Sequence, residues 1–203
     1  MKTTVIFHSA DMDFKNPVSG KQKWPRAEVL AVAEELQALF APACERIAIV
    51  GSVRRRLDFC SDVELLFVSR LSERPDGLFD SRIVNVAAEV CDKLLADGVL
   101  AKRPNKNGHF AWGEANKLSV HVASGIPVDL FSCPPQNYWV SLVIRTGSKE
   151  TNLRLTNGAI ERGGRLNAYG SGVSWKDGTH TEAKSEQGVF ALCGIKYLEP
   201  CDR

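Results

Sequence analysis

Long apolar segments are missing from this sequence. No stretch approaches the roughly 20 apolar residues that a helix needs to cross a lipid bilayer. The opening residues, "MKTTVIFHSADMDF", have too short an apolar core for a secretory signal peptide. We therefore expect a chain that has no membrane partner and works in the cytoplasm.

Metal-binding patterns of cysteine and histidine are missing as well. The sequence has six cysteines and four histidines, but no Cys-x-x-Cys motif and no histidine at a spacing typical of zinc ligands. The scattered cysteines favour buried free thiols in a reducing compartment over a zinc site. Of the histidines, we expect His121 to face outward from its strand.

Neither sign of charge dominates. Lysine and arginine number 26 and aspartate and glutamate 24, which gives a net charge of +2. This balance does not require a polyanionic partner, although clustered basic residues would permit one. With 203 residues, the chain has room for one compact domain or two small ones.

Hydrophobic periodicity divides the chain into two parts. In the first part helices alternate with strands: we expect helices over 25–40 and 83–95, strands over 46–50 and 62–69, and a hairpin over 117–131. The last third is mostly helix and turn, with helices expected over 135–144, 148–162 and 185–193. The pattern predicts an α+β domain followed by a small helix-rich one, with the joint near "SCPP" (132–135) and an irregular arm over 1–24.

Two acids open one of these strands. "CSDVELLFV" places Asp62 and Glu64 two residues apart, directly before an apolar run. Side chains at i and i+2 of a strand point to the same face, so the two carboxylates would meet while Val63 and Leu65 face the core. Two close carboxylates repel unless a cation lies between them, and oxygen ligands suit Mg²⁺. The alternative is an edge strand whose acids face solvent.

Two further segments carry polar residues that suit phosphate chemistry. Upstream, Gly51 and Ser52 follow a strand and precede three arginines. A serine that opens a helix can offer its hydroxyl and nearby amides to a phosphate, which an arginine can neutralise. Downstream, Asp129 interrupts the apolar strand "IPVDLF" and needs a partner there. Three acids on adjacent strands could hold two ions about 3.5–4 Å apart, which suits phosphoryl transfer.

These segments together resemble a known signature. "GSVRRRLDFCSDVEL" (51–65) is similar to that of nucleotidyltransferases, in which Gly-Ser is followed at a fixed distance by Asp-x-Asp or Asp-x-Glu. Its spacing resembles that of family X DNA polymerases, the group of polymerase beta. "VDLFSCPPQNYWVSLVIRTGSKETNLRL" (128–155) resembles the third-carboxylate strand, hinge helix and Thr-Gly-Ser motif of that family. The likeness runs from about residue 26 to 203.

The resemblance implies an α+β fold with two domains. A nucleotidyltransferase palm, a mixed sheet flanked by helices, would span 25–133, and a helix-rich polymerase-beta-like thumb would span 134–203. It also implies a monomeric enzyme that uses Mg²⁺, which Mn²⁺ can replace. Such an enzyme adds nucleoside monophosphates from (d)NTPs to a primer 3′-hydroxyl, on a DNA primer/template or gapped DNA in repair.

The resemblance further implies roles for individual residues. Asp62 and Glu64 would bind both metal ions, and Asp129 would bind the catalytic one. The incoming nucleotide would be held by Gly51, Ser52, Arg55, Arg145, Thr146, Gly147, Ser148 and Asn152. The peptide bond between Gly147 and Ser148 would be cis. Contacts to the nucleic acid would come from Lys149, Arg154, Arg162 and Arg165.

The sequence also departs from the family pattern. Glu64 stands where the family usually carries aspartate, and Pro127 replaces an arginine that orients the third acid, so Asp129 is expected to lack that partner. Ile144-Arg145 replaces an aromatic pair next to the sugar. Thr156 replaces an arginine that contacts the template strand. Sugar selection and templating are therefore left open.

Three other functions remain compatible with these residues. A template-independent terminal transferase would use the same three acids, and the residue at position 156 favours it slightly. A transferase that attaches AMP to a protein or small molecule shares the Gly-Ser and Asp-x-Glu pattern but has little use for a thumb. An inactive DNA-binding module would follow if the two departures near the acids had eroded the site, although all three acids are retained.

Overall fold

The computed structural model describes residues 22–77 and 80–203. Most of the arm predicted over 1–24 lies outside the described residues. Its last residue, Trp24, belongs to strand β1 (Trp24–Pro25), which pairs with β3 (Phe59–Cys60). Within the described ranges, none of the helices combines the length and the hydropathy that a membrane span requires.

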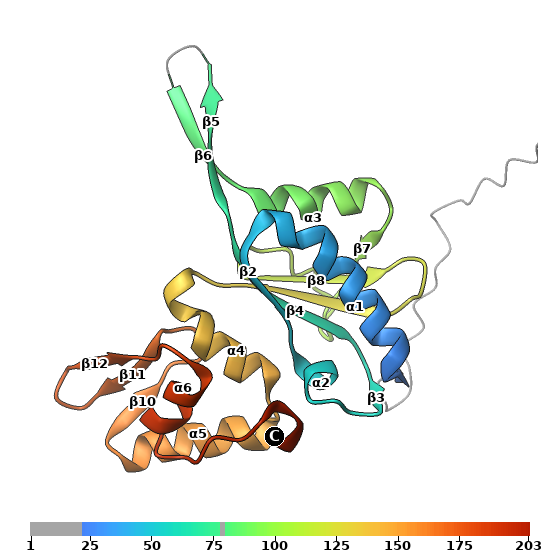
Figure 1. The fold of residues 1–203 in the computed structure, drawn as a ribbon. Helices are drawn as coiled ribbons and strands as arrows, with labels where there is room; N and C mark the ends of the chain where they lie inside the picture. Colours follow the sequence, from blue (N-terminus) through green and yellow to red (C-terminus); the bar gives the residue numbers. More distant parts are fainter. Residues whose placement is uncertain (1–21, 78–79) are drawn as a thin grey trace, which may run out of the picture.

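A five-stranded mixed sheet forms the centre of the first part of the chain (Figure 1). Its strands in spatial order are β2 (Cys44–Ile49), β4 (Val63–Ser69), β9 (Pro127–Ser132), β8 (Asn116–His121) and β7 (Leu100–Lys102). Strands β4 and β9 run parallel, and the other neighbours are antiparallel. The predicted strands and hairpin are confirmed. Strand β7 was not predicted, because three residues are too few to display an alternating pattern.

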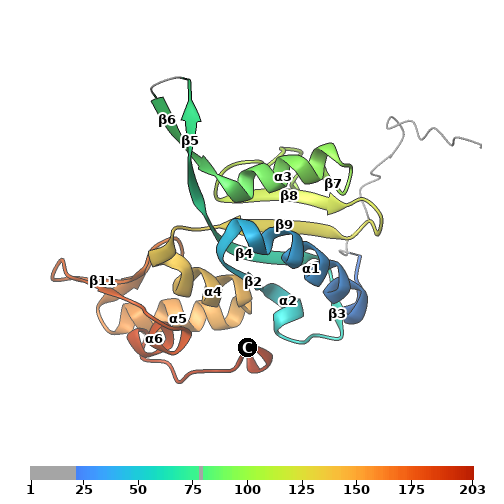
Figure 2. The ribbon, with the colours of Figure 1, turned by 45° about the horizontal axis from the view of Figure 1, so that its top comes forward.

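Two helices cover one face of this sheet. Helix α1 (Arg26–Phe40) and helix α3 (Val86–Ala96) pack on the side to which Val63, Leu65 and Phe67 of β4 point, and all three side chains are at most 2% exposed. Figure 2 shows both helices on the same side of the sheet. The alternation along β4 therefore directs its even-numbered residues, Glu64 included, to the opposite face.

Helix α4 (Tyr138–Thr146) joins the sheet to the last part of the chain. One side of it covers the far end of the opposite sheet face, in a cluster formed by Val50, Leu66, Val68, Phe131, Tyr138 and Leu142. Its other side contributes Val140 and Val143 to a second core, which lies among the elements that follow. A single helix thus fixes the second core next to the acid-bearing end of the sheet.

The second core is enclosed by helices and a small sheet. Its elements are α5 (Lys149–Glu161), β10 (Gly164–Leu166), β11 (Gly172–Trp175), β12 (His180–Glu182) and α6 (Glu186–Leu192). The helices match the prediction, but the small antiparallel sheet formed by β10, β11 and β12 was not predicted. Short 3₁₀ turns complete the fold at Ala41–Ala43, Pro135–Asn137 and Pro200–Asp202.

A second difference concerns the helix expected to begin at position 83. Residues 80–85 instead form β6 (Asp80–Asn85), which pairs with β5 (Leu71–Asp76) in a hairpin that projects from the sheet in both views (Figures 1 and 2). Ile83 is 66% exposed. Helix α3 begins only after Asn85, whose side chain accepts a hydrogen bond from the Ala88 amide. Ile83 and Val84, which precede this cap, fit the apolar spacing of the helix but belong to β6.

The thiol environments lead to a labelling prediction. Burial raises the pKa of Cys44, Cys91 and Cys193 to about 11, whereas Cys201 is exposed. Because the thiolate is the reactive form, we expect a thiol reagent at pH 8 to modify Cys201 within minutes and these three only after unfolding. Mass spectrometry of the native and denatured protein measures this. Rapid native labelling of Cys44, Cys91 or Cys193 in a Cys201→Ser variant would contradict it.

Candidate active site

Three acids lie on one face of the central sheet, at the end that α4 leaves uncovered. Glu64 of β4 is directly opposite Asp129 of β9 in the parallel register, and Asp62 precedes Glu64 by two residues. Burial, together with the negative charges of Asp62 and Asp129, raises the pKa of Glu64 from 4.5 to about 8, against the opposing charges of Arg145 and Arg55. The carboxylates of Asp62 and Asp129 are therefore close enough to affect the ionisation of Glu64.

Asp129 has a basic partner that its own strand does not supply. The Arg103 guanidinium, which follows β7, forms an ion pair and a hydrogen bond with the Asp129 carboxylate. Position 127 is indeed without the arginine of the family pattern, but Asp129 still has a guanidinium partner, which is supplied by the residue that follows β7. The expectation for His121 is wrong, since this side chain is 7% exposed and its Nδ1 lies 2.8 Å from the Ser124 hydroxyl.

The donor set of the three acids suits a divalent cation, since carboxylate oxygens are the ligands that Mg²⁺ prefers. Glu64 and Asp129 share one sheet face, and burial together with the charges of Asp62 and Asp129 favours the protonated form of Glu64. In the described part of the chain, however, no three acidic, histidine or cysteine side chains are gathered into a closed metal site. Asp62, Glu64 and Asp129 are the residues that would hold Mg²⁺, and their side chains would have to come closer together to do so.

The Gly-Ser motif lies against these acids. Gly51 begins the single helical turn α2 (Gly51–Arg54) with φ +64°, and a Cβ added there would lie 1.6 Å from Oε2 of Glu64. Only glycine therefore allows the Glu64 carboxylate to approach the turn so closely. Among the described residues, the hydroxyl of Ser52 is buried and has no hydrogen-bond partner. A buried hydroxyl without a hydrogen bond carries a desolvation penalty. A polar ligand such as a phosphate would remove this penalty by accepting a hydrogen bond from Ser52.

Gly51→Ala tests this close approach. We expect the added methyl group to displace the Glu64 carboxylate and to destabilise the fold by about 2 kcal/mol, from overlap plus left-handed backbone strain. Gly98→Ala is the matched control, because Gly98 also has a positive φ, +71°, with nothing within 4 Å of an added Cβ. Urea unfolding measures both variants. Equal destabilisation would show that backbone strain alone is felt at position 51.

The Thr-Gly-Ser segment (Thr146 to Ser148) lies next to the turn that carries the Gly-Ser motif. Arg55 of the motif donates a hydrogen bond to the Thr146 carbonyl, and the Gly147–Ser148 peptide bond is cis, as the resemblance implied. Ser148 caps α5 by accepting a hydrogen bond from the Thr151 amide. Asn152 of that helix donates to the Ile144 carbonyl at 2.8 Å, and its Oδ1 is buried without a partner among the described residues.

The Arg145 side chain lies over an aromatic ring, close enough to Glu64 for its charge to oppose the rise in the pKa of that acid. Its guanidinium carbon is 3.7 Å from the centroid of the Phe131 ring and 6.0 Å from that of Tyr169. The three side chains line a pocket of about 170 Å³ between the sheet, α4 and the loop before β11. The nucleotide contact expected of Arg145 stays a prediction.

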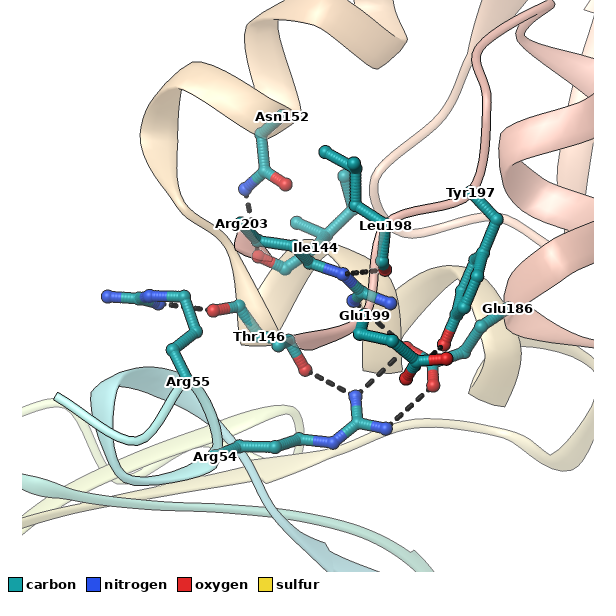
Figure 3. Close-up of polar contacts among 10 residues, drawn as sticks. All are labelled: Arg54, Arg55, Ile144, Thr146, Asn152, Glu186, Tyr197, Leu198, Glu199 and Arg203. Carbon is teal, nitrogen blue, oxygen red and sulfur yellow. Dashed lines mark hydrogen bonds and ion pairs between the residues drawn. The ribbon is translucent and has the colours of Figure 1, made fainter. Parts of the chain in front are cut away.

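A buried ion-pair network joins the Gly-Ser turn to the C-terminal part of the chain (Figure 3). Arg54 donates to both carboxylate oxygens of Glu186, at 2.9 and 2.6 Å, and to the Thr146 hydroxyl at 2.7 Å. The Arg203 guanidinium donates to the same carboxylate at 3.0 Å. The turn that carries Ser52 is therefore anchored to α4, α6 and the last residue of the chain.

The four basic residues expected to contact nucleic acid are exposed. They lie along α5, at its C-terminal end and on β10, at positions Lys149, Arg154, Arg162 and Arg165. Asp58, the loop acid between the Gly-Ser turn and Asp62, is exposed as well. The basic side chains are thus available to a polyanion, and their contacts stay a prediction.

Comparison with known proteins shows which proteins share this fold. Residues 141–203 match the family model described as the DNA polymerase beta thumb. Among solved structures, the chain is similar to Leishmania infantum polymerase beta in a ternary P/T complex. The TM-score is 0.67 at 20% identity, over 90% of this chain and 77% of that one. The fold is similar to that of polymerase beta. A search of curated proteins finds no significant match.

In this polymerase-beta-like fold, the matched thumb segment begins inside α4, the helix shared by the two cores. The predicted division into 25–133 and 134–203 stays a prediction. The sequence did not indicate that Arg103 pairs with Asp129 or that Glu186 pairs with Arg54. Their partners Asp129 and Arg54 lie 26 and 132 positions away, and no local spacing rule connects residues that far apart.

Proposed function

We propose that this polymerase-like chain is a metal-dependent nucleotidyltransferase. It would add nucleoside monophosphates from (d)NTPs to the 3′-hydroxyl of a DNA primer, as a minimal polymerase that fills gaps during repair. The observation that carries the proposal is the pairing of Glu64 with Asp129 across two parallel strands, beside the buried hydroxyl of Ser52, which has no hydrogen-bond partner within residues 22–77 and 80–203. Acids that can gather cations next to a phosphate-binding turn suit in-line phosphoryl transfer.

Each group of residues would perform a distinct task. Ser52 and Arg55 would bind the β- and γ-phosphates, and the backbone of Thr146 to Ser148 would lie along the sugar. Asp62, Glu64 and Asp129 would hold two Mg²⁺ ions, which supply charge neutralisation and lower the pKa of the attacking hydroxyl. Asp129 would in addition orient the primer 3′-hydroxyl. Positioning and neutralisation of charge would thus account for most of the rate.

A template-independent transferase is the second candidate. The hydroxyl of Thr156 donates to the Asn152 carbonyl at 2.9 Å within α5. This position therefore offers no charge to a template phosphate or base, which favours addition that ignores the template. The same three acids would serve both reactions.

Primer extension tests the proposal and separates these candidates. The purified protein should lengthen a labelled primer with Mg²⁺ on templated or gapped DNA, and Asp129→Ala should abolish this while retaining the wild-type unfolding midpoint within a few degrees. Equal extension with every dNTP, regardless of the template base, would identify a terminal transferase. A primer that never lengthens, even with Mn²⁺, would contradict both candidates, and full activity of Asp129→Ala would show that this acid is misassigned.

A further inference from the structure

Arg103 reaches Asp129 across an intervening strand. It directly follows β7, and its backbone amide donates to the Leu118 carbonyl of β8 at 3.1 Å. Leu118 is in turn the register partner of Asp129 on β9. The residues therefore form one row across three strands, and the Arg103 side chain crosses β8 to meet the carboxylate.

Two contacts hold the guanidinium in place. The Nε atom of Arg103 donates to the Ser119 carbonyl at 3.0 Å, and a terminal nitrogen binds the Asp129 carboxylate. Both side chains are largely buried, with exposed fractions of 23% and 16%. Pro104 follows Arg103 and restricts its backbone to extended conformations. A guanidinium fixed by backbone contacts fixes the carboxylate that it binds.

We propose that Arg103 is a positioning residue for the reaction, which orients the Asp129 carboxylate toward the primer 3′-hydroxyl from a strand two positions away in the sheet. This inference rests on the proposed function. It assigns to β7 and its connection to β8 a part in the active site, although neither segment carries one of the three acids. Arg103 would act on the chemical step and leave nucleotide binding, which depends on Ser52 and Arg55, nearly unchanged.

Kinetics of Arg103→Gln test the proposal. With Mg²⁺, we expect kcat for primer extension to fall about 10- to 100-fold, as is typical when a residue that orients a metal ligand is lost. KM for the nucleotide should change less than about threefold. Arg103→Lys, which keeps the charge but not the fork of donors, should recover part of the rate.

Lys102→Gln is the matched control. It removes the same charge one residue away, from an exposed side chain whose Nζ lies 4.9 Å from the centroid of the Trp112 ring. Adjacent side chains of a strand point to opposite faces, so we expect less than a twofold change in kcat. If Arg103→Gln behaves like Lys102→Gln, the proposal is overturned. A variant that loses DNA affinity with an unchanged chemical step would also overturn it and would make Arg103 a nucleic-acid contact.

A metal-free measurement separates this inference from the proposed function. Thermal unfolding of Arg103→Gln, Asp129→Asn and the double variant in EDTA should be non-additive by about 2–4 °C, because the pair is lost only once. If the wild-type protein never extends a primer, the proposed function fails, while the cycle still reports on the pair. Additive Tm changes would remove the basis for a positioning role.

Discussion

Glu186→Gln is expected to destabilise the protein by about 3 kcal/mol at neutral pH, or roughly 6–12 °C in Tm for a chain of this size. The wild-type carboxylate is only 9% exposed and binds two guanidinium groups, of which that of Arg203 is fully buried. The variant would leave the charges of Arg54 and Arg203 close together and without their counter-charge. Thermal and urea unfolding measure the effect.

An exposed pair of the same chemistry provides the control. Arg74 and Glu89 are also 2.6 Å apart, but their side chains are 47% and 40% exposed. Solvent screening limits such pairs to less than about 1 kcal/mol, so Glu89→Gln should change the Tm by no more than about 2 °C. Equal effects of the two variants would mean that the buried network does not hold the Gly-Ser turn to the C-terminal part.

The pH dependence of this network has a defined sign. Burial opposes ionisation of Glu186, but the hydrogen bond and charge of Arg54, with the charge of Arg203, outweigh it and lower the pKa of Glu186 below 4.5. A lowered pKa stabilises the folded state above the unfolded value, and this stability is lost as the pH falls through the folded pKa. The difference between wild type and Glu186→Gln should therefore shrink below about pH 4.5.

The local features of this site follow from the sequence, whereas its long-range contacts do not. Alternation along β4 predicts that Asp62 and Glu64 share a face, and the apolar strand around Asp129 predicts that this acid needs a partner. Both rest on a period of two residues, which sequence displays directly. The pairing of Arg103 with Asp129 depends on the order of strands β9, β8 and β7, which no periodicity encodes.

The contrast between local patterns and long-range contacts also explains the errors in the predicted fold. Ile83 continues the apolar spacing of α3 backward, but the Asn85 cap begins the helix later and leaves residues 80–85 to an exposed hairpin. His121 ends β8 where alternation suggests an outward side chain, yet contact with Ser124 and proximity to Glu35 of α1 enclose it. In each case a capping or tertiary contact overrides the local pattern.

Glu64→Gln should abolish the proposed nucleotidyl transfer and yet stabilise the metal-free protein at alkaline pH. The raised pKa of Glu64, about 8, reflects burial and the charges of Asp62 and Asp129. A raised pKa means that the folded state is stabilised by the protonated acid below the unfolded value, near 4.5, and that this stability is lost as the pH rises through about 8. Glutamine keeps the shape of the side chain and remains neutral at every pH.

The magnitude of this effect follows from the size of the shift. Each unit of pKa difference corresponds to about 1.4 kcal/mol, and partial exposure of Glu64 reduces the full value, so we expect Glu64→Gln to be about 2–3 kcal/mol more stable than wild type at pH 9 in EDTA. At pH 4 the two proteins should unfold at nearly the same temperature. Divalent cations should stabilise wild type and leave the variant nearly unaffected, because a cation supplies the counter-charge that three ionised acids require. An equal Tm of the two proteins at pH 9 would show that Glu64 is not held under repulsion, and the electrostatic basis for cation binding at this sheet face would be lost.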